Sequence, residues 1–212
     1  MNEEIIGDIR EEAKNYFAAV CPSHNWSHVE RVYDLCIKIG REEGADLFVL
    51  KLASLLHDIG REKEKENPEK LDHAKISGEI IPSILKKYNI NEQIIQHVVN
   101  CVSTHRARNN KIPESKEAKI LFDADKLDSI GAIGVARSYA WAGNKGLQLY
   151  SDKNYLGTGY EKNHSPLTEF NFGLKNVKNM LFTETAKKIA EERHNFMVSF
   201  FDRLNKEVKG LK

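Results

Sequence analysis

Apolar residues recur at spacings of three and four along most of this chain, which is the period of a helix with one buried face. The first two patterns of this kind span residues 3–20 and 26–39. Pro22 stops the first because proline cannot continue a helix, and Gly40 and Gly44 follow the second. The chain is therefore predicted to begin with two amphipathic helices.

A third stretch is more uniformly apolar and is predicted to be a buried helix that ends near Gly60. It carries His57 and Asp58 at its end. Taken alone, such a pair is more often a capped helix end with a hydrogen-bonded core histidine than a metal site. Residues 61–70 follow and are highly charged, so an exposed connection is expected there.

Further helical patterns cover residues 71–88, a segment capped by Asn91, a segment capped by Ser115, and residues 183–208. Residues 143–173 lose this periodicity and are rich in glycine, which predicts either a long loop or lid or a disordered segment. No convincing run alternates apolar and polar residues as a strand would. The predicted fold class is therefore all-α, a single-domain helical bundle over residues 1–212.

Charge and cysteine content narrow the class of protein. The 212 residues contain 32 Lys plus Arg and 31 Asp plus Glu, a formal net charge of +1, which argues against a general nucleic-acid or membrane surface. Cys21, Cys36 and Cys101 are far apart and form no Cys-x-x-Cys pattern, so a disulfide framework is not expected. The acidic N-terminus and the lack of a bilayer-length apolar run indicate a cytoplasmic protein, compatible with a homo-oligomer.

Metal-ligand side chains occur on several predicted helices. His28 lies in the first turn of the second helix, His57 and Asp58 end the third, and residues 123–128 place acids around the edge of a buried face. Such an arrangement is typical of a metal site in a bundle core, and its nitrogen and oxygen donors suit one divalent ion of Mn, Fe, Co, Ni, Zn or Mg. Periodicity does not choose among the acids at 123–128. His105 continues a buried stripe, which also fits a core histidine.

Four ordered segments resemble the HD-domain metal-dependent phosphohydrolases, which have a His, then a His-Asp dipeptide, then a later Asp. The segments are His24-Asn-Trp-Ser-His28-Val-Glu-Arg31-Val, the His57-Asp58 pair, Phe122-Asp-Ala-Asp-Lys-Leu-Asp-Ser-Ile-Gly-Ala-Ile-Gly-Val-Ala-Arg137, and the closing Thr183-Glu-Thr-Ala with Glu191-Glu-Arg-His-Asn-Phe-Met197. They are similar to a small bacterial and archaeal branch that includes nucleoside triphosphate pyrophosphohydrolases, and the resemblance covers about residues 24–201.

The resemblance implies a ligand set of His28, His57, Asp58 and Asp125, because the last ligand of the family precedes Lys in Ala-Asp-Lys-Leu. Asp123 stays the alternative. One position departs from the branch, which usually has Asp where this chain has Asn25. An amide still forms hydrogen bonds, but it cannot act as a base there.

The implied reaction is hydrolysis of a nucleotide phosphate, for which Asp58 would orient the nucleophile. Lys126 would neutralise phosphoryl charge unless it is a surface lysine, and Arg61 would reach the same phosphates unless it is exposed. His73 and His105 would protonate a leaving group, bind a second metal or fill structural positions. The remaining substrate-binding candidates are Arg106, Arg193 and Lys175.

The leading expected activity is a (deoxy)nucleoside triphosphate pyrophosphohydrolase with a small-molecule nucleotide as its substrate. A 5′-nucleotidase or a cyclic or signalling nucleotide phosphodiesterase is the alternative enzyme. A nucleotide-sensing module without turnover is the alternative from another class.

Overall fold

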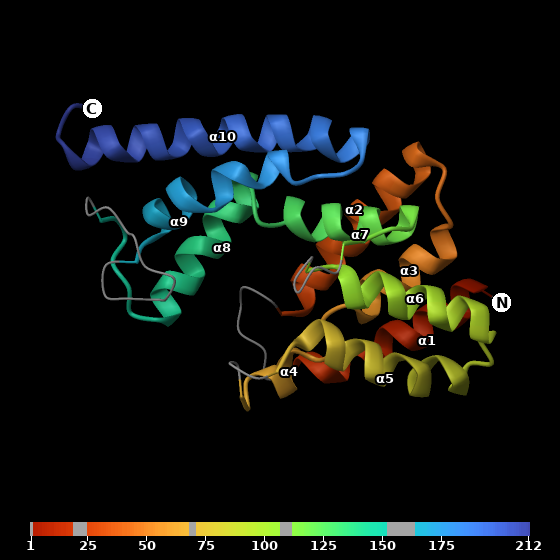
Figure 1. Cartoon of the computed structure of the whole chain (residues 1–212). Helices are drawn as coiled ribbons and strands as arrows, with labels where there is room; N and C mark the ends of the chain where they lie inside the picture. The colour runs from red at the N-terminus through yellow and green to blue at the C-terminus, as the bar shows by residue number, and fades with distance from the viewer. Residues whose placement is uncertain (1, 19–24, 68–70, 107–111, 152–163) are drawn as a thin grey trace. The chain divides into compact units, whose positions relative to one another are not determined.

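The computed structural model describes residues 2–18, 25–67, 71–106, 112–151 and 164–212 (Figure 1). Within these ranges the chain forms helices and no strand, so the all-α prediction is confirmed. Contacts divide the chain into two compact units, residues 1–125 and 126–212, and each is described by itself. No helix in the described ranges is both long and apolar enough to cross a bilayer.

The N-terminal unit contains α1 (Asn2–Lys14), the 3-10 helix η1 (Asn15–Phe17), α2 (Trp26–Glu43), α3 (Leu47–Leu56), α4 (Arg61–Glu64), α5 (His73–Lys87), α6 (Glu92–Thr104) and most of α7 (Lys116–Leu127). The C-terminal unit contains α8 (Gly131–Asn144), α9 (Pro166–Phe172), the 3-10 helix η3 (Leu174–Asn179) and α10 (Glu184–Val208). In the second unit α10 packs on α8 and η3, and α9 packs on the same two elements.

Helix α3 is the central element of the N-terminal unit, because α1, α2 and α6 all pack against it. The helix starts after Asp46, whose side chain accepts hydrogen bonds from the N–H groups of Phe48 at 2.8 Å and Val49 at 3.2 Å. Its residues 49, 50 and 52–56 are buried, as expected for a helix that is covered on several sides. The buried helix delivers His57 and Asp58 to the interior of the unit.

Helix α2 is longer than predicted and passes through Gly40, where the sequence pattern indicated an end near Ile39. A Cβ at Gly40 would lie only 2.4 Å from Leu50 Cδ1, so glycine permits the close approach of α2 to α3. The helix ends at Gly44 instead, which adopts the left-handed conformation at φ +63° that favours glycine.

The contact between α2 and α3 gives a stability prediction. Leu50 is fully buried, and Leu50→Ala is expected to lower the free energy of unfolding by about 2–5 kcal/mol because the truncation leaves a cavity. Urea denaturation followed by circular dichroism would measure the change. Leu211→Ala is the matched control, because Leu211 is 70% exposed and its truncation should change little. Equal effects of the two substitutions would contradict the described packing.

Two connections differ from their predictions. Residues 61–64 form the short helix α4, and two of its residues, Arg61 and Glu64, contact buried groups, so the expectation of a wholly exposed connection is wrong. Residues 166–172 form α9 inside the segment predicted to be irregular. Its middle, residues 152–163, lies outside the described ranges. The closing helix is confirmed, and Thr183 caps it by accepting from the N–H of Ala186.

Candidate metal centre

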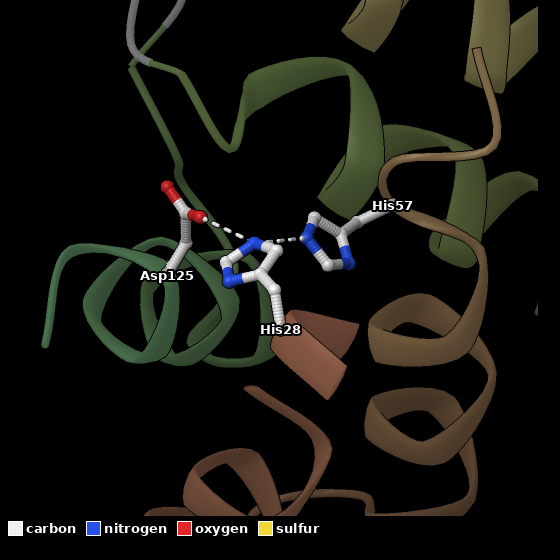
Figure 2. Close-up of side chains that lie close together, drawn as sticks. All are labelled: His28, His57 and Asp125. Atoms are coloured by element: carbon white, nitrogen blue, oxygen red, sulfur yellow. Dashed lines mark hydrogen bonds and ion pairs between the residues drawn. The ribbon is translucent and has the colours of Figure 1, made fainter. Parts of the chain in front are cut away.

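Three predicted ligands come together from three different helices of the N-terminal unit (Figure 2). His28 lies in the first turn of α2, His57 caps the C-terminus of α3, and Asp125 lies near the end of α7. His28 Nε2 is 3.3 Å from His57 Nε2 and 3.4 Å from Asp125 Oδ1. Both histidines are fully buried, and the Asp125 side chain is 14% exposed.

The His57 ring is oriented by the end of its own helix. His57 Nδ1 lies 2.7 Å from the carbonyl oxygen of Ser54. A carbonyl only accepts, so Nδ1 carries the proton and the neutral ring presents the Nε2 lone pair to the cluster. Burial lowers the pKa of His57 to about 4, because the charged form is poorly solvated there. His57 is therefore neutral near pH 7, as metal binding requires.

Asp58 lies between two groups of imidazoles. Its Oδ2 is 3.6 Å from His28 Nε2 and 3.5 Å from His57 Nε2. Its Oδ1 is 3.1 Å from His73 Nε2 and 3.6 Å from His105 Nε2. The two oxygens of one carboxylate thus face two separate sets of nitrogen atoms, and Asp58 belongs to both.

The charge of Asp58 is maintained by its neighbours. Burial alone would raise the pKa of this carboxyl group, but Arg61, His57 and His73 hold it well below its usual value. Arg61 donates its Nε–H to Asp58 Oδ2, and the Arg61 side chain is only 19% exposed. Arg61 therefore has a carboxylate partner in the site.

The donor atoms of the first group have the spacing that a common ion requires. Ligands about 2.1 Å from one ion are separated by roughly 3.0 Å at an octahedral angle and roughly 3.4 Å at a tetrahedral angle. The contacts of His28 Nε2 with His57 Nε2 and Asp125 Oδ1, at 3.3 and 3.4 Å, fall in that range. The residues therefore fit a divalent metal.

The second group consists of Asp58, His73 and His105, all buried. His105 Nδ1 lies 2.6 Å from the carbonyl oxygen of Val102, so its Nε2 lone pair also points inward. Among the described residues, Asp58 Oδ1 and His73 Nε2 are buried atoms without a hydrogen-bond partner, although they are 3.1 Å apart. Buried polar atoms are normally paired, so these two atoms fit the binding of a metal ion.

A carboxylate that the sequence did not single out lies behind His73. Glu64 Oε2 is 2.8 Å from His73 Nδ1, and Glu64 Oε1 is 2.8 Å from Arg106 Nη1. Arg106 Nη1 also lies 3.1 Å from Asp72 Oδ1, and Asp72 caps α5 through the N–H of Ala74. An Asp directly before His73 could have been predicted from the sequence to cap a helix. Glu64 could not be singled out, because it is one of many charged residues in the segment 61–70.

Four further residues that the sequence singled out are Asp123, Lys126, Lys175 and Arg193. Asp123 is buried on α7 but does not belong to the donor group of His28 and His57. Lys126 is half-buried, next in the chain after Asp125, and belongs to the C-terminal unit. In that unit Lys175 is exposed on η3, and Arg193 Nη1 donates to the carbonyl oxygen of Leu127 at 2.5 Å.

The position that departs from the phosphohydrolase pattern has a structural role. Asn25 caps α2, and its side-chain oxygen accepts from the N–H of Ser27 at 3.1 Å and from the Ser27 hydroxyl at 2.6 Å. An amide oxygen is sufficient for both bonds. Asn25 therefore supports the helix that carries His28 without needing a charge.

Comparison with known proteins identifies the family of this chain. A model of the HD domain matches residues 25–130. The sequence is 37% identical to Bacillus subtilis YpgQ over 89% of this chain and 86% of YpgQ. The crystal structure of YpgQ in complex with ADP is similar with a TM-score of 0.78 and 31% identity, covering 100% of this chain and 99% of that one. An HD-superfamily hydrolase from Bacillus thuringiensis has a TM-score of 0.76 and 28% identity over 99% of each chain. The chain therefore belongs to the HD domain family, within the superfamily of HD hydrolases.

Proposed function

We propose that this protein is a metal-dependent phosphohydrolase that acts on nucleotides. The observation that carries the proposal is the fully buried Asp58 carboxylate, whose Oδ2 faces His28 and His57 while its Oδ1 faces His73 and His105. A buried carboxylate ringed by imidazoles has no simple structural purpose, since packing alone would favour apolar side chains at these positions.

The first divalent ion is proposed to bind His28, His57, Asp58 Oδ2 and Asp125. A second ion would bind Asp58 Oδ1, His73 and His105, where two buried atoms have no hydrogen-bond partner among the described residues. Divalent ions supply Lewis acidity, which lowers the pKa of water and stabilises charge on phosphoryl oxygens.

The protein side chains contribute orientation and charge. The backbone carbonyls of Ser54 and Val102 fix the rings of His57 and His105, so that each directs a lone pair into the site. Arg61 keeps Asp58 ionised in a buried position. Lys126 is proposed to neutralise phosphoryl charge during the reaction.

The proposed substrate is a (deoxy)nucleoside triphosphate that is cleaved to a monophosphate and pyrophosphate. In this reaction a water oxygen bonds to the α-phosphorus, the bond from that phosphorus to the bridging oxygen breaks, and pyrophosphate leaves. The ADP complex of YpgQ supports a nucleotide ligand in this family of structures. Two neighbouring ligand groups are also compatible with phosphodiester cleavage, so a nucleotide phosphodiesterase is the second candidate.

Product analysis tests the proposal. The metal-stripped protein should be inactive, and added Mn²⁺ should restore hydrolysis of nucleoside triphosphates with pyrophosphate and monophosphate as products. Ion chromatography would identify these products, and elemental analysis of the purified protein would identify the ion. Release of inorganic phosphate from monophosphates would indicate a 5′-nucleotidase instead. A protein that binds nucleotide with metal but forms no product would be a sensor, and the phosphohydrolase proposal would be wrong.

A further inference from the structure

The ring of His73 is oriented by a different kind of contact from the rings of His57 and His105. His57 and His105 each lie within 2.7 Å of a backbone carbonyl three residues earlier in the chain. His73 stands at the start of α5 instead, where no preceding turn of the helix offers a carbonyl. Its Nδ1 instead lies 2.8 Å from Glu64 Oε2 on the separate helix α4.

Both oxygens of the Glu64 carboxylate face nitrogen atoms: Oε1 accepts from Arg106 Nη1, and Oε2 faces the His73 ring. A carboxylate paired with a guanidinium in this way only accepts hydrogen bonds. The proton of the contact must therefore sit on His73 Nδ1, which leaves the Nε2 lone pair directed toward Asp58 Oδ1 at 3.1 Å. Arg106 Nη1 is also 3.2 Å from Nδ1, but the shorter contact to Glu64 favours the proton on Nδ1.

Glu64 is itself held in place. One of its oxygens, Oε1, accepts from Arg106 Nη1 at 2.8 Å and lies 3.3 Å from the backbone N–H of His73. Arg106 is anchored in turn by Asp72 at 3.1 Å, and Asp72 caps the helix that begins with His73. Three side chains, those of Glu64, Arg106 and Asp72, thus form a network behind the His73 ring, and the Arg106 side chain is only 18% exposed.

We infer that Glu64 is a positioning residue, which fixes the tautomer and orientation of His73 so that Nε2 serves as a ligand of the second metal ion. The inference deepens the proposed metal site and rests on it. A carboxylate behind a histidine ligand also raises the basicity of that ligand, and loss of such a partner typically weakens metal affinity about 10- to 100-fold. In this network Arg106 holds Glu64 through the bond from Nη1 to Oε1.

The test compares Glu64→Gln with Glu62→Gln, an exposed glutamate on the same helix. Nitrogen-15 NMR of the histidine rings, recorded on the metal-free protein at alkaline pH, reports which ring nitrogen carries the proton. The signal of His73 would be assigned from its loss in His73→Asn. We expect Nδ1 protonation at His73 in the wild type and in Glu62→Gln, and a shift toward Nε2 protonation in Glu64→Gln.

Calorimetric titration with Mn²⁺ gives the second measurement. Glu64→Gln should weaken binding of the second equivalent about 10- to 100-fold and leave the first equivalent unchanged. A wild-type His73 that is protonated on Nε2 would overturn the inference, and so would a Glu64→Gln protein with an unaltered tautomer. A changed tautomer with unchanged Mn²⁺ binding would overturn the ligand role. A wild type that binds no Mn²⁺ would instead refute the proposed function, while the NMR result would still decide whether Glu64 positions His73.

Discussion

Asp58→Asn is expected to lower kcat/KM by about 10³-fold or more. Removal of one electrostatic contact in an active site typically lowers the rate by about 10²- to 10³-fold, and Asp58 makes several such contacts. The substitution keeps the shape of the side chain but removes the charge that faces His28, His57, His73 and His105. Both proposed ions lose a ligand at once, so elemental analysis should find the variant depleted of metal. Steady-state assays with Mn²⁺ and a nucleoside triphosphate would measure the rate.

Asp202→Asn is the matched control, because Asp202 is an exposed acid on α10 and the same chemical change there should leave activity and metal content unaltered. Circular dichroism would establish that both variants keep their helical content. An Asp58→Asn protein with wild-type activity would remove Asp58 from the site and with it the proposed function.

Asp125→Asn is expected to weaken Mn²⁺ binding at the first site and to lower kcat/KM by about 10²–10³-fold. The physical reason is that Asp125 Oδ1 lies 3.4 Å from His28 Nε2, which is the spacing of two ligands around one ion. Calorimetric titration and steady-state assays would measure both quantities.

The informative comparison is Asp123→Asn, two residues earlier on the same helix. Asp123 is fully buried, but it is not part of the donor group formed by His28, His57 and Asp125. Asp123→Asn should therefore change the melting temperature more than the metal affinity. If Asp123→Asn loses the metal and Asp125→Asn retains it, then the fourth ligand is Asp123 and the proposed ligand set is wrong.

The features that the sequence predicted well are local ones. Asn91 and Ser115 were expected to cap helices, and each accepts a hydrogen bond from the N–H three residues later, at 2.9 Å from Ile94 and 3.1 Å from Ala118. The spacing of His105 along its apolar stripe predicted a buried residue, and it is 1% exposed. Such signals depend on residues within one or two turns, so a single sequence contains them.

The features that the sequence missed depend on distant contacts or on short elements. Gly40 resembled a helix end in the sequence. Glycine is needed there because the side chain of Leu50, on another helix, leaves no room for a Cβ atom. Helix α9 has seven residues, which is fewer than two full turns, so no periodicity could develop. Glu64 appeared as one charge among many in residues 61–70, although it contacts His73, nine positions later.

The orientation of Asp58 toward two groups of imidazoles could not be predicted from the sequence either. The His-Asp pair and its family resemblance pointed to one metal ion, and they contain no information about where each carboxylate oxygen is directed. That direction depends on the turn at residues 57–60, where the N–H of Gly60 donates to Ser77 Oγ at 2.9 Å. A Cβ at Gly60 would lie 2.5 Å from the carbonyl oxygen of His73, so a larger residue would separate this turn from α5.

The rings of His57 and His105 each donate a hydrogen bond to a carbonyl in the last turn of their own helix, and these bonds affect how the protein binds a metal ion. Contacts across three residues are local, so they form together with the helix end itself, on a scale of about a microsecond. Two rings are thus immobilised at no further cost when an ion arrives, so less rotational freedom is lost on binding. The protein should capture its metal as a folded receptor, with both rings already in place.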